Sequence, residues 1–361
     1  MTRFGVWDLV HARAGVSTAD LYAQHLEEME LAQALGFSEY WVAEHIFHRE
    51  HSLLPSPSLL LATAAARVPQ LRLGVLVHVL PLHDPLRLAG ECAMLDQLTR
   101  GRIYVGVGRG ARLDEYRRLG IDQATSRERF EEALALMRRL WTEDRVDHEG
   151  RYYRCHDATL APQPYQRPHP PVVMATVGDE SLEWAAREAI GIARGPEPAA
   201  RLAQAWARYT AAYRAAGHTG RPSLRIMRQI YVAPTDAEAR AAARPWLFRF
   251  FQLFAGLDRS GVEPTNEAYA ELTGAALGGR FGRWTYDELI DHDLVLIGSP
   301  ARVAEQVGRL LGAADVEAFL GMFSFGTMPR AAALASLRRF AEEVVPRVRA
   351  GLAGLASRAG S

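Results

Sequence analysis

The chain has 361 residues, with 42 basic side chains, 42 acidic side chains and 48% hydrophobic residues, which is a globular composition. The balanced charge argues against nucleic-acid binding, because phosphate recognition draws its affinity from clustered cations. All 42 basic residues are arginines. Mechanisms that need a lysine, such as a Schiff base or a phosphate-loop lysine, are therefore excluded.

Two cysteines, Cys92 and Cys155, are too few for a disulfide scaffold or a cysteine-rich metal site, and they suit a reducing compartment. The first ten residues lack a basic region followed by an apolar run, so we predict no secretory signal. No uninterrupted apolar run approaches the ~18 residues of a membrane span. We expect a soluble, cytoplasmic protein that binds neither nucleic acid nor membranes.

Short apolar runs alternate with longer amphipathic stretches along the whole chain. In chain order we predict a strand at 4–7, a helix at 18–35 ended by Gly36, a strand at 37–43, a helix at 57–68, a strand at 71–80 and a helix at 85–98. A strand at 102–107 and a helix at 126–141 follow, with Ser126 as its N-cap. The second half predicts strands at 172–176, 190–193, 224–232 and 319–325, and helices at 179–187, 198–216, 236–255 and 328–345.

About eight strands, each followed by a helix, imply right-handed parallel units. Eight such units fit a closed barrel better than an open sheet, so we predict an α/β fold, a TIM (β/α)8 barrel, as one domain over residues 1–361. The length beyond ~250 residues must lie in insertions. Residues 142–171 resemble a hairpin with a loop, and the glycine-rich residues 256–293 are predicted to form a lid.

Active sites of such barrels lie at the carboxyl ends of the strands. After the second predicted strand come Glu44, His45, His48 and His51. Three-residue spacing hints at a metal site, but the HExxH order is absent and the signal is weak. His45, nearest to the strand end, suits acid–base chemistry or a hydrogen bond to a cofactor. A solvated polar loop is the alternative.

After the fourth strand, Arg109 lies within a run of three alternating glycines at 106–110. A guanidinium beside glycines suits a phosphate, and Arg127 at the next helix adds a second cation. The run does not match GxGxxG, and a tight turn with a surface arginine is the alternative.

After the fifth strand, residues 176–181 lead into a helix whose free N–H groups and Ser181 hydroxyl also suit a phosphate. Capping of that helix by Asp179 is the alternative. No GxSxG elbow, paired-aspartate site or kinase signature occurs, so a hydrolase lacks a nucleophile.

Several motifs together resemble the bacterial luciferase-like family of flavin-dependent monooxygenases over residues 4–348. YWVAEHIF at 40–47 is similar to the family's W-x-x-E-H-H-F. VLPLHDPLRLA at 79–89 and LDQLTRGR at 95–102 match its most distinctive stretch. GVGRG at 106–110, EWAA at 183–186 and IGSP at 297–300 follow in the family's order.

The resemblance implies a TIM-like barrel that holds FMN, supplied in reduced form by a separate flavin reductase. Reduced flavin would react with oxygen to give a flavin hydroperoxide, which oxygenates an organic substrate. His45 matches the family's active-site histidine, and Leu76–Val77 matches a frequent non-proline cis peptide under the flavin. The implied cofactor-binding positions are Glu44, Leu76, Val77, Arg109, Arg127, Val177, Gly178 and Ser181. No metal is implied.

Three positions depart from the family pattern. Ile46 replaces the second histidine of the family's pair, Gly108 replaces the reactive cysteine of luciferase itself, and Gly178 replaces a serine of the phosphate loop. These departures argue against light emission and against luciferase's aldehyde substrate, and leave flavin binding intact.

The helix at 236–255 carries an aromatic stripe that predicts a substrate pocket lined by Phe250, Phe251 and Phe254. We therefore expect a fairly large apolar or aromatic substrate, covered by the predicted lid. Members of the family commonly dimerise through the helices matched by 57–68 and 85–98, which implies a homodimer. The alternatives are a deazaflavin-dependent oxidoreductase on the same fold, a non-catalytic flavin-binding subunit and, last, a metal hydrolase.

Overall fold

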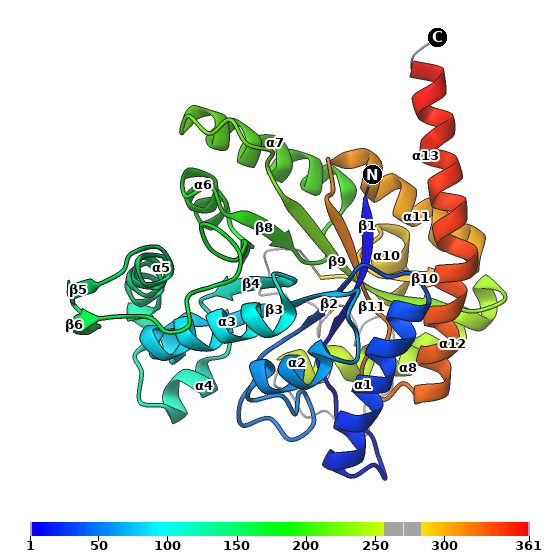
Figure 1. The fold of residues 1–361 in the computed structure, drawn as a ribbon. Coiled ribbons are helices and arrows are strands. Elements are labelled where there is room, and N and C mark those ends of the chain that lie inside the picture. Colours follow the sequence, from blue (N-terminus) through cyan, green and yellow to red (C-terminus); the bar gives the residue numbers. More distant parts are fainter. Residues whose placement is uncertain (1, 256–269, 271–282, 360–361) are drawn as a thin grey trace.

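Eight parallel strands form the wall of a closed barrel in this computed structural model, which describes residues 2–255, 270 and 283–359 (Figure 1). Going round the barrel, β9 is followed by β11, β1, β2, β3, β4, β7 and β8, and β8 pairs with β9 again. The predicted TIM barrel is confirmed, and each predicted strand supplies one strand of the wall. The strands are β1 (Arg3–Asp8), β2 (Glu39–Val42), β3 (Arg72–Val79), β4 (Ile103–Gly108), β7 (Val172–Ala175), β8 (Gly191–Arg194), β9 (Leu224–Val232) and β11 (Ala318–Met322).

Helices surround this wall, and their starts follow from local sequence. Ser17 accepts a hydrogen bond from the Asp20 N–H at the start of the first helix, and Asp84 caps the third helix just before Pro85. The predicted helices are present as α1 (Thr18–Ala34), α2 (Pro57–Ala65), α3 (Pro85–Thr99), α5 (Ser126–Thr142), α6 (Asp179–Arg187), α7 (Ala199–Ala215), α8 (Asp236–Ala255) and α12 (Arg330–Arg339).

Several local predictions need correction. Thr125, and not Ser126, is the N-cap of α5. The last predicted helix continues from α12 through a π-helical stretch, Phe340–Val344, into α13 (Val345–Ala359), which extends away from the barrel in Figure 1. Among the described residues, three α-helices and a short ninth strand of the sheet were not predicted. They are α4 (Leu113–Arg118), α10 (Tyr286–Asp291), β10 (Leu296–Gly298) and α11 (Pro300–Ala313).

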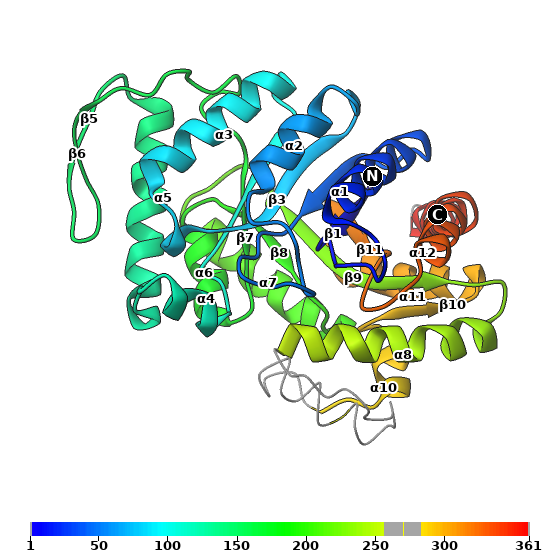
Figure 2. The same ribbon diagram turned by 90° about the horizontal axis from the view of Figure 1, so that it is seen from below.

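The two predicted insertions differ in how much of them the structure describes. Within residues 142–171, β5 (Val146–Glu149) and β6 (Arg154–Ala158) pair as an antiparallel hairpin that lies beside α5 (Figures 1 and 2). The predicted lid at 256–293 lies mostly outside the described residues, and its last part contains α10.

The alternating glycines at 106–110 allow β4 to approach the end of β3 closely. A Cβ atom at Gly106 would lie 1.9 Å from the Val75 carbonyl oxygen, and one at Gly108 would lie 2.7 Å from Val77 Cγ2. A Cβ at Gly110 would meet Val79 in the same way, at 2.6 Å from its Cγ1. These glycines therefore fit the backbone and side chains of β3, whereas the sequence had suggested close approach to a ligand.

Side chains fill the amino-terminal end of the barrel interior. The buried Arg225 guanidinium stacks 4.2 Å from the Tyr104 ring centroid and donates to Glu39 at 3.2 Å. Trp41 also donates to Glu39, at 2.9 Å. With this end packed, the carboxyl ends of the strands are where a ligand can bind. They face the viewer in Figure 2, because β1 runs downward from the amino terminus in Figure 1. Over the described part of the chain, every helix is too short or too polar to span a bilayer.

Replacing Gly106 with Ala should destabilise the fold strongly, by about 3 kcal/mol or more, because the clashing atom is a backbone oxygen that cannot rotate away. The matched control is Gly308→Ala in α11, where no atom lies within 4 Å of the new Cβ. That change should be neutral or stabilise by up to about 1 kcal/mol. Urea unfolding of both variants measures the difference, and equal midpoints would contradict the close-approach argument.

Candidate active site

The end of β3 presents an irregular backbone at the barrel mouth. The Leu76–Val77 peptide bond is cis, as the resemblance implies. The pairing of β3 with β4 shifts register between Val75 and His78. Trp7, at the end of β1, donates its indole N–H to the Leu76 carbonyl at 3.3 Å. Residues 76–77 thus lie in the irregular part of the β3–β4 pairing, and a side chain of β1 binds their backbone across the barrel mouth.

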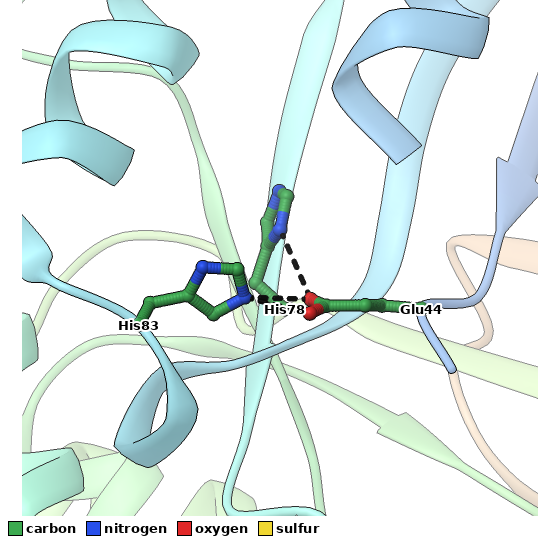
Figure 3. A group of neighbouring side chains, drawn as sticks. All are labelled: Glu44, His78 and His83. Carbon is green, nitrogen blue, oxygen red and sulfur yellow. Dashed lines mark hydrogen bonds and ion pairs between the residues drawn. The ribbon is translucent and has the colours of Figure 1, made fainter. Parts of the chain in front are cut away.

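Glu44 lies just after β2 and binds two histidines that follow the cis bond (Figure 3). His83 Nε2 donates to both carboxylate oxygens, at 2.7 and 2.8 Å, and His78 Nδ1 lies 3.6 Å from Oε2. Burial by itself would raise the pKa of Glu44, but these two histidines lower it to about 2. Burial likewise opposes the charge on His83, yet the Glu44 hydrogen bond raises its pKa. The buried carboxylate and the partly exposed His83 therefore form an ion pair.

This pair determines what Glu44 can do. Its carboxylate also accepts from the Val79 N–H at 3.4 Å, so it fixes the end of β3. The ligand atoms of Glu44, His78 and His83 lie within 4.8 Å of one another, a spacing that could hold a metal ion, and buried Asp8, His25 and Glu28 have the same property. In both groups a carboxylate already pairs with a histidine whose pKa is raised, so ion pairing accounts for them.

His45 is oriented by a carboxylate from α4. Its Nδ1 lies 3.2 Å from Glu115 Oε1, which also accepts from the Ile46 N–H at 3.2 Å. His48 Nε2 lies 3.1 Å from the same oxygen. A carboxylate can only accept, so Nδ1 of His45 carries the proton and Nε2 is left for a ligand.

The histidines after β2 gather into one cluster. The ring centroids of His45 and His51 are 4.7 Å apart, and His48 lies about 6 Å from each. Residues 43–56 form no helix, so side chains at three-residue spacing can converge. His51 is buried, neither of its ring nitrogens has a hydrogen-bond partner among the described residues, and burial lowers its pKa. It is a neutral imidazole with a free donor and a free acceptor.

The amino end of α6 offers unsatisfied backbone N–H groups. Its N-cap, Gly178, provides no side-chain cap, and the Ser181 hydroxyl donates to the Gly178 carbonyl at 2.8 Å. Asp179 instead pairs with Arg208 on α7 at 2.8 Å, so the capping alternative is not what the structure contains. Val177 is exposed beside this end.

Two arginines accompany this helix end. Arg127, from α5, contacts Glu180 in the first turn of α6 and pairs with Glu131 at 2.9 Å. Arg109 is exposed, and its guanidinium has no carboxylate partner among the described residues. The Tyr116 hydroxyl donates to the Arg109 carbonyl and so ties this loop to α4. An uncapped helix end with two guanidinium groups fits a phosphate monoester.

A cleft of about 640 Å³ opens beside the histidine cluster, between the loop after β2, α4 and the end of α8. Phe254 lines it and is 37% exposed. Phe250 and Phe251, predicted to line a pocket, do not line this cleft and are buried in the core beneath it. Phe250 stacks on Phe254, with centroids 5.9 Å apart, and thereby supports the wall.

Comparison with known proteins places this arrangement in a family. The family described as luciferase-like monooxygenase matches residues 2–314. This chain belongs to that family. It is therefore an enzyme of the flavin-dependent monooxygenase kind, and the predicted resemblance is confirmed.

Three similar proteins illustrate the range of the luciferase-like family. Limonene 1,2-monooxygenase of Rhodococcus erythropolis is 31% identical over 80% of this chain and 71% of its own length. The oxygenase component of flavin-dependent trigonelline monooxygenase from Acinetobacter baylyi is 30% identical over 62% of each chain. The crystal structure of the monooxygenase RslO1 from Streptomyces bottropensis superposes with a TM-score of 0.81 at 29% identity, over 96% of this chain and 99% of that one.

Sequence reasoning missed the groups that organise this luciferase-like site. Glu115 was overlooked with the whole of α4, although that helix has acidic residues in its first turn and arginines in its last, a helix-dipole pattern. His83 was read as part of a family motif and His78 as part of a strand. Their convergence on Glu44 depends on the irregular end of β3, for which no sequence pattern exists.

Replacing Glu44 with Gln should destabilise the enzyme by about 3 kcal/mol near neutral pH, because it removes the buried anion of an ion pair. Folding lowers the pKa of this carboxylate from 4.5. Its contribution to the free energy of unfolding is therefore present above that pH and is lost as pH falls towards 2. The difference in the free energy of unfolding between wild type and variant should shrink over that range. In the variant the imidazole pKa of His83 should also fall, and NMR can follow it.

The matched control is Glu149→Gln, which breaks an exposed pair with His156 and should leave stability within experimental error. A stability gap that stayed constant from neutral pH down to pH 2 would show that the Glu44 charge contributes nothing.

Proposed function

We propose that this protein is the oxygenase of a two-component system that uses reduced FMN and oxygen to oxygenate a fairly large organic substrate with an aromatic part. The observation that carries the proposal is the cradle of Arg109, Arg127 and the α6 amino end, at the same end of the barrel as His45. Bound reduced FMN would supply the electrons that activate oxygen.

In this proposal the cradle binds the FMN phosphate. Backbone N–H groups at Val177 and Gly178 would face the anion, with the positive end of the helix dipole behind them. The Ser181 hydroxyl would turn from the Gly178 carbonyl to donate to it. Arg127 is held by Glu180 and Glu131 and would turn from Glu180 towards the phosphate. Arg109 has no carboxylate partner to give up within the described chain, so it should contribute more to affinity.

The flavin ring would then lie over Leu76 and Val77, next to the histidine cluster. His45, with Nδ1 donating to Glu115, can hold a proton or a hydrogen bond at Nε2 and direct it at the reacting edge. The cleft wall formed by Phe254 would exclude water from one side of the substrate. Glu44 would act as a positioning residue, because its carboxylate binds the Val79 N–H at the end of β3 and the His83 ring.

Supply of reduced FMN by a separate reductase is also part of the proposal. A relative that is 30% identical is an oxygenase component by its name, which supports a division of labour between two proteins. The short cradle suits a cofactor with one terminal phosphate. A deazaflavin has a phosphate as well, so it is the competing cofactor that the binding test must separate.

Anaerobic titration with reduced FMN should give tight binding, and mixing with oxygen should give a long-lived transient absorbance change. Arg109→Gln should weaken FMN binding about 10- to 100-fold through the loss of charge-assisted hydrogen bonds. His45→Ala should leave affinity similar and shorten the transient. The control is Arg338→Gln, an exposed arginine on α12 that should change neither quantity.

Failure to bind reduced FMN together with tight binding of reduced deazaflavin would overturn the FMN assignment. Binding of reduced FMN without any oxygen-dependent transient would favour a reductase or a non-catalytic flavin carrier instead.

We also propose a homodimer through α2 and α3. Three large apolar side chains are exposed on these neighbouring helices: Leu59 at 72%, Met94 at 56% and Leu98 at 51%. Contiguous exposed apolar surface is typical of an association site.

Replacing Leu98 with Glu should weaken the dimer at least about tenfold, because burial of a leucine side chain is worth about 1.5–3 kcal/mol and a buried charge costs more. Sedimentation velocity over a dilution series measures the effect. Leu119→Glu, at an exposed apolar position after α4, is the control and should leave association unchanged. A wild-type protein that sediments as a monomer at all concentrations would contradict the proposal.

A further inference from the structure

The cleft beside the histidine cluster carries more positive than negative charge. Its lining includes four arginines and two carboxylates, in addition to His48 and His51. The charged residues are Arg49, Glu50, Arg112, Asp114, Arg117 and Arg249. This composition differs from the apolar pocket that the aromatic stripe of α8 had suggested.

Two of these arginines already have partners. Arg249 pairs with Glu50. Arg112 lies 3.6 Å from Asp114 and donates to the carbonyls of Leu253 and Phe254, at 3.4 Å each. Both carboxylates of the cleft are therefore paired with an arginine. The two paired arginines also connect separate segments that line the cleft.

The other two arginines, Arg49 and Arg117, are exposed, and their guanidinium groups make no hydrogen bond or ion pair within residues 2–255, 270 and 283–359. They come from two segments that both line the cleft, the loop after β2 and the last turn of α4. A concave surface with a net excess of one charge concentrates the field and attracts ligands of the opposite charge. A guanidinium presents a planar fork that matches a carboxylate or a sulfonate.

The inner part of the cleft has a different chemistry. His51 lies 6.0 Å from the Phe254 ring, and Phe47 also lines the cleft, so aromatic surfaces adjoin the imidazole. The buried His51 ring is unpartnered among the described residues and lies 4.7 Å from His45. A planar body could therefore stack here and make one hydrogen bond to His51, next to the histidine at the mouth.

We propose that the substrate of this enzyme is an organic anion with an aromatic body, whose carboxylate or sulfonate is bound by Arg49 and Arg117. The anionic group lies at the cleft rim, and the opposite end of the molecule reaches past Phe254 and His51 towards His45. Calling the ligand a substrate rests on the proposed monooxygenase function, whereas the anion preference of the cleft can be measured without it.

A matched pair of fluorescent probes tests this preference. 8-Anilinonaphthalene-1-sulfonate and N-phenyl-1-naphthylamine share the same ring system and differ in the sulfonate. The sulfonate probe should bind the purified full-length protein more tightly. The double variant Arg49→Gln/Arg117→Gln should weaken it about tenfold or more and leave the neutral probe within about twofold. Binding of the sulfonate probe should also weaken in about 0.5 M salt.

Four further variants complete the test. Phe254→Ala should weaken both, because it removes the stacking wall. Arg338→Gln is the surface control and should change neither. The single variants Arg49→Gln and Arg117→Gln, each at an exposed position, give the same test if the double variant does not fold.

Equal binding of both probes, or an unchanged sulfonate affinity in the double variant, would overturn the proposal. Loss of the sulfonate probe in Arg109→Gln, with no loss in the double variant, would place the anion in the phosphate cradle and overturn it as well. Failure of the FMN titration would reject the proposed cofactor without affecting either probe result, so the two failures are distinguishable.

Discussion

The close approach of β4 to β3 is the constraint on which the active-site end of this barrel depends. Every second residue at 106–110 must lack a Cβ, because the backbone of β3 and the side chains of Val77 and Val79 occupy that space. This approach accommodates the irregular end of β3, with its register shift after Val75. The irregular end in turn sets residues 76–77 at the mouth and brings His78 and His83 to Glu44.

Two buried carboxylates then organise the histidines around the mouth. Glu44 forms an ion pair with His83 and holds the end of β3, whereas Glu115 fixes the tautomer of His45 and contacts His48. A carboxylate without such partners would be costly to bury, so each pair stabilises its own placement. Glu44 and Glu115 therefore both position the histidines and interact with them electrostatically.

Arginine provides all the permanently charged cationic side chains of this protein. In the proposed phosphate cradle, Arg109 and Arg127 lie beside an uncapped helix end, and Arg49 and Arg117 line the cleft. Guanidinium groups suit both places because they stay charged and bind oxyanions in a planar, bidentate manner. The site thus presents guanidinium groups both at the end of α6 and in the cleft, and the histidine cluster adjoins the cleft.

The sequence by itself determined the barrel and the family, because strand–helix alternation is a local pattern and the motifs are contiguous. It also pointed to His45, Arg109 and Ser181, which follow directly on predicted strands or begin a helix. The tertiary structure alone decided that Asp179 turns to Arg208, that Phe254 lines the cleft while Phe250 and Phe251 do not, and that Glu115 reaches His45. Each of these depends on contacts between segments far apart in the chain, and a local sequence pattern does not encode which side chains meet there.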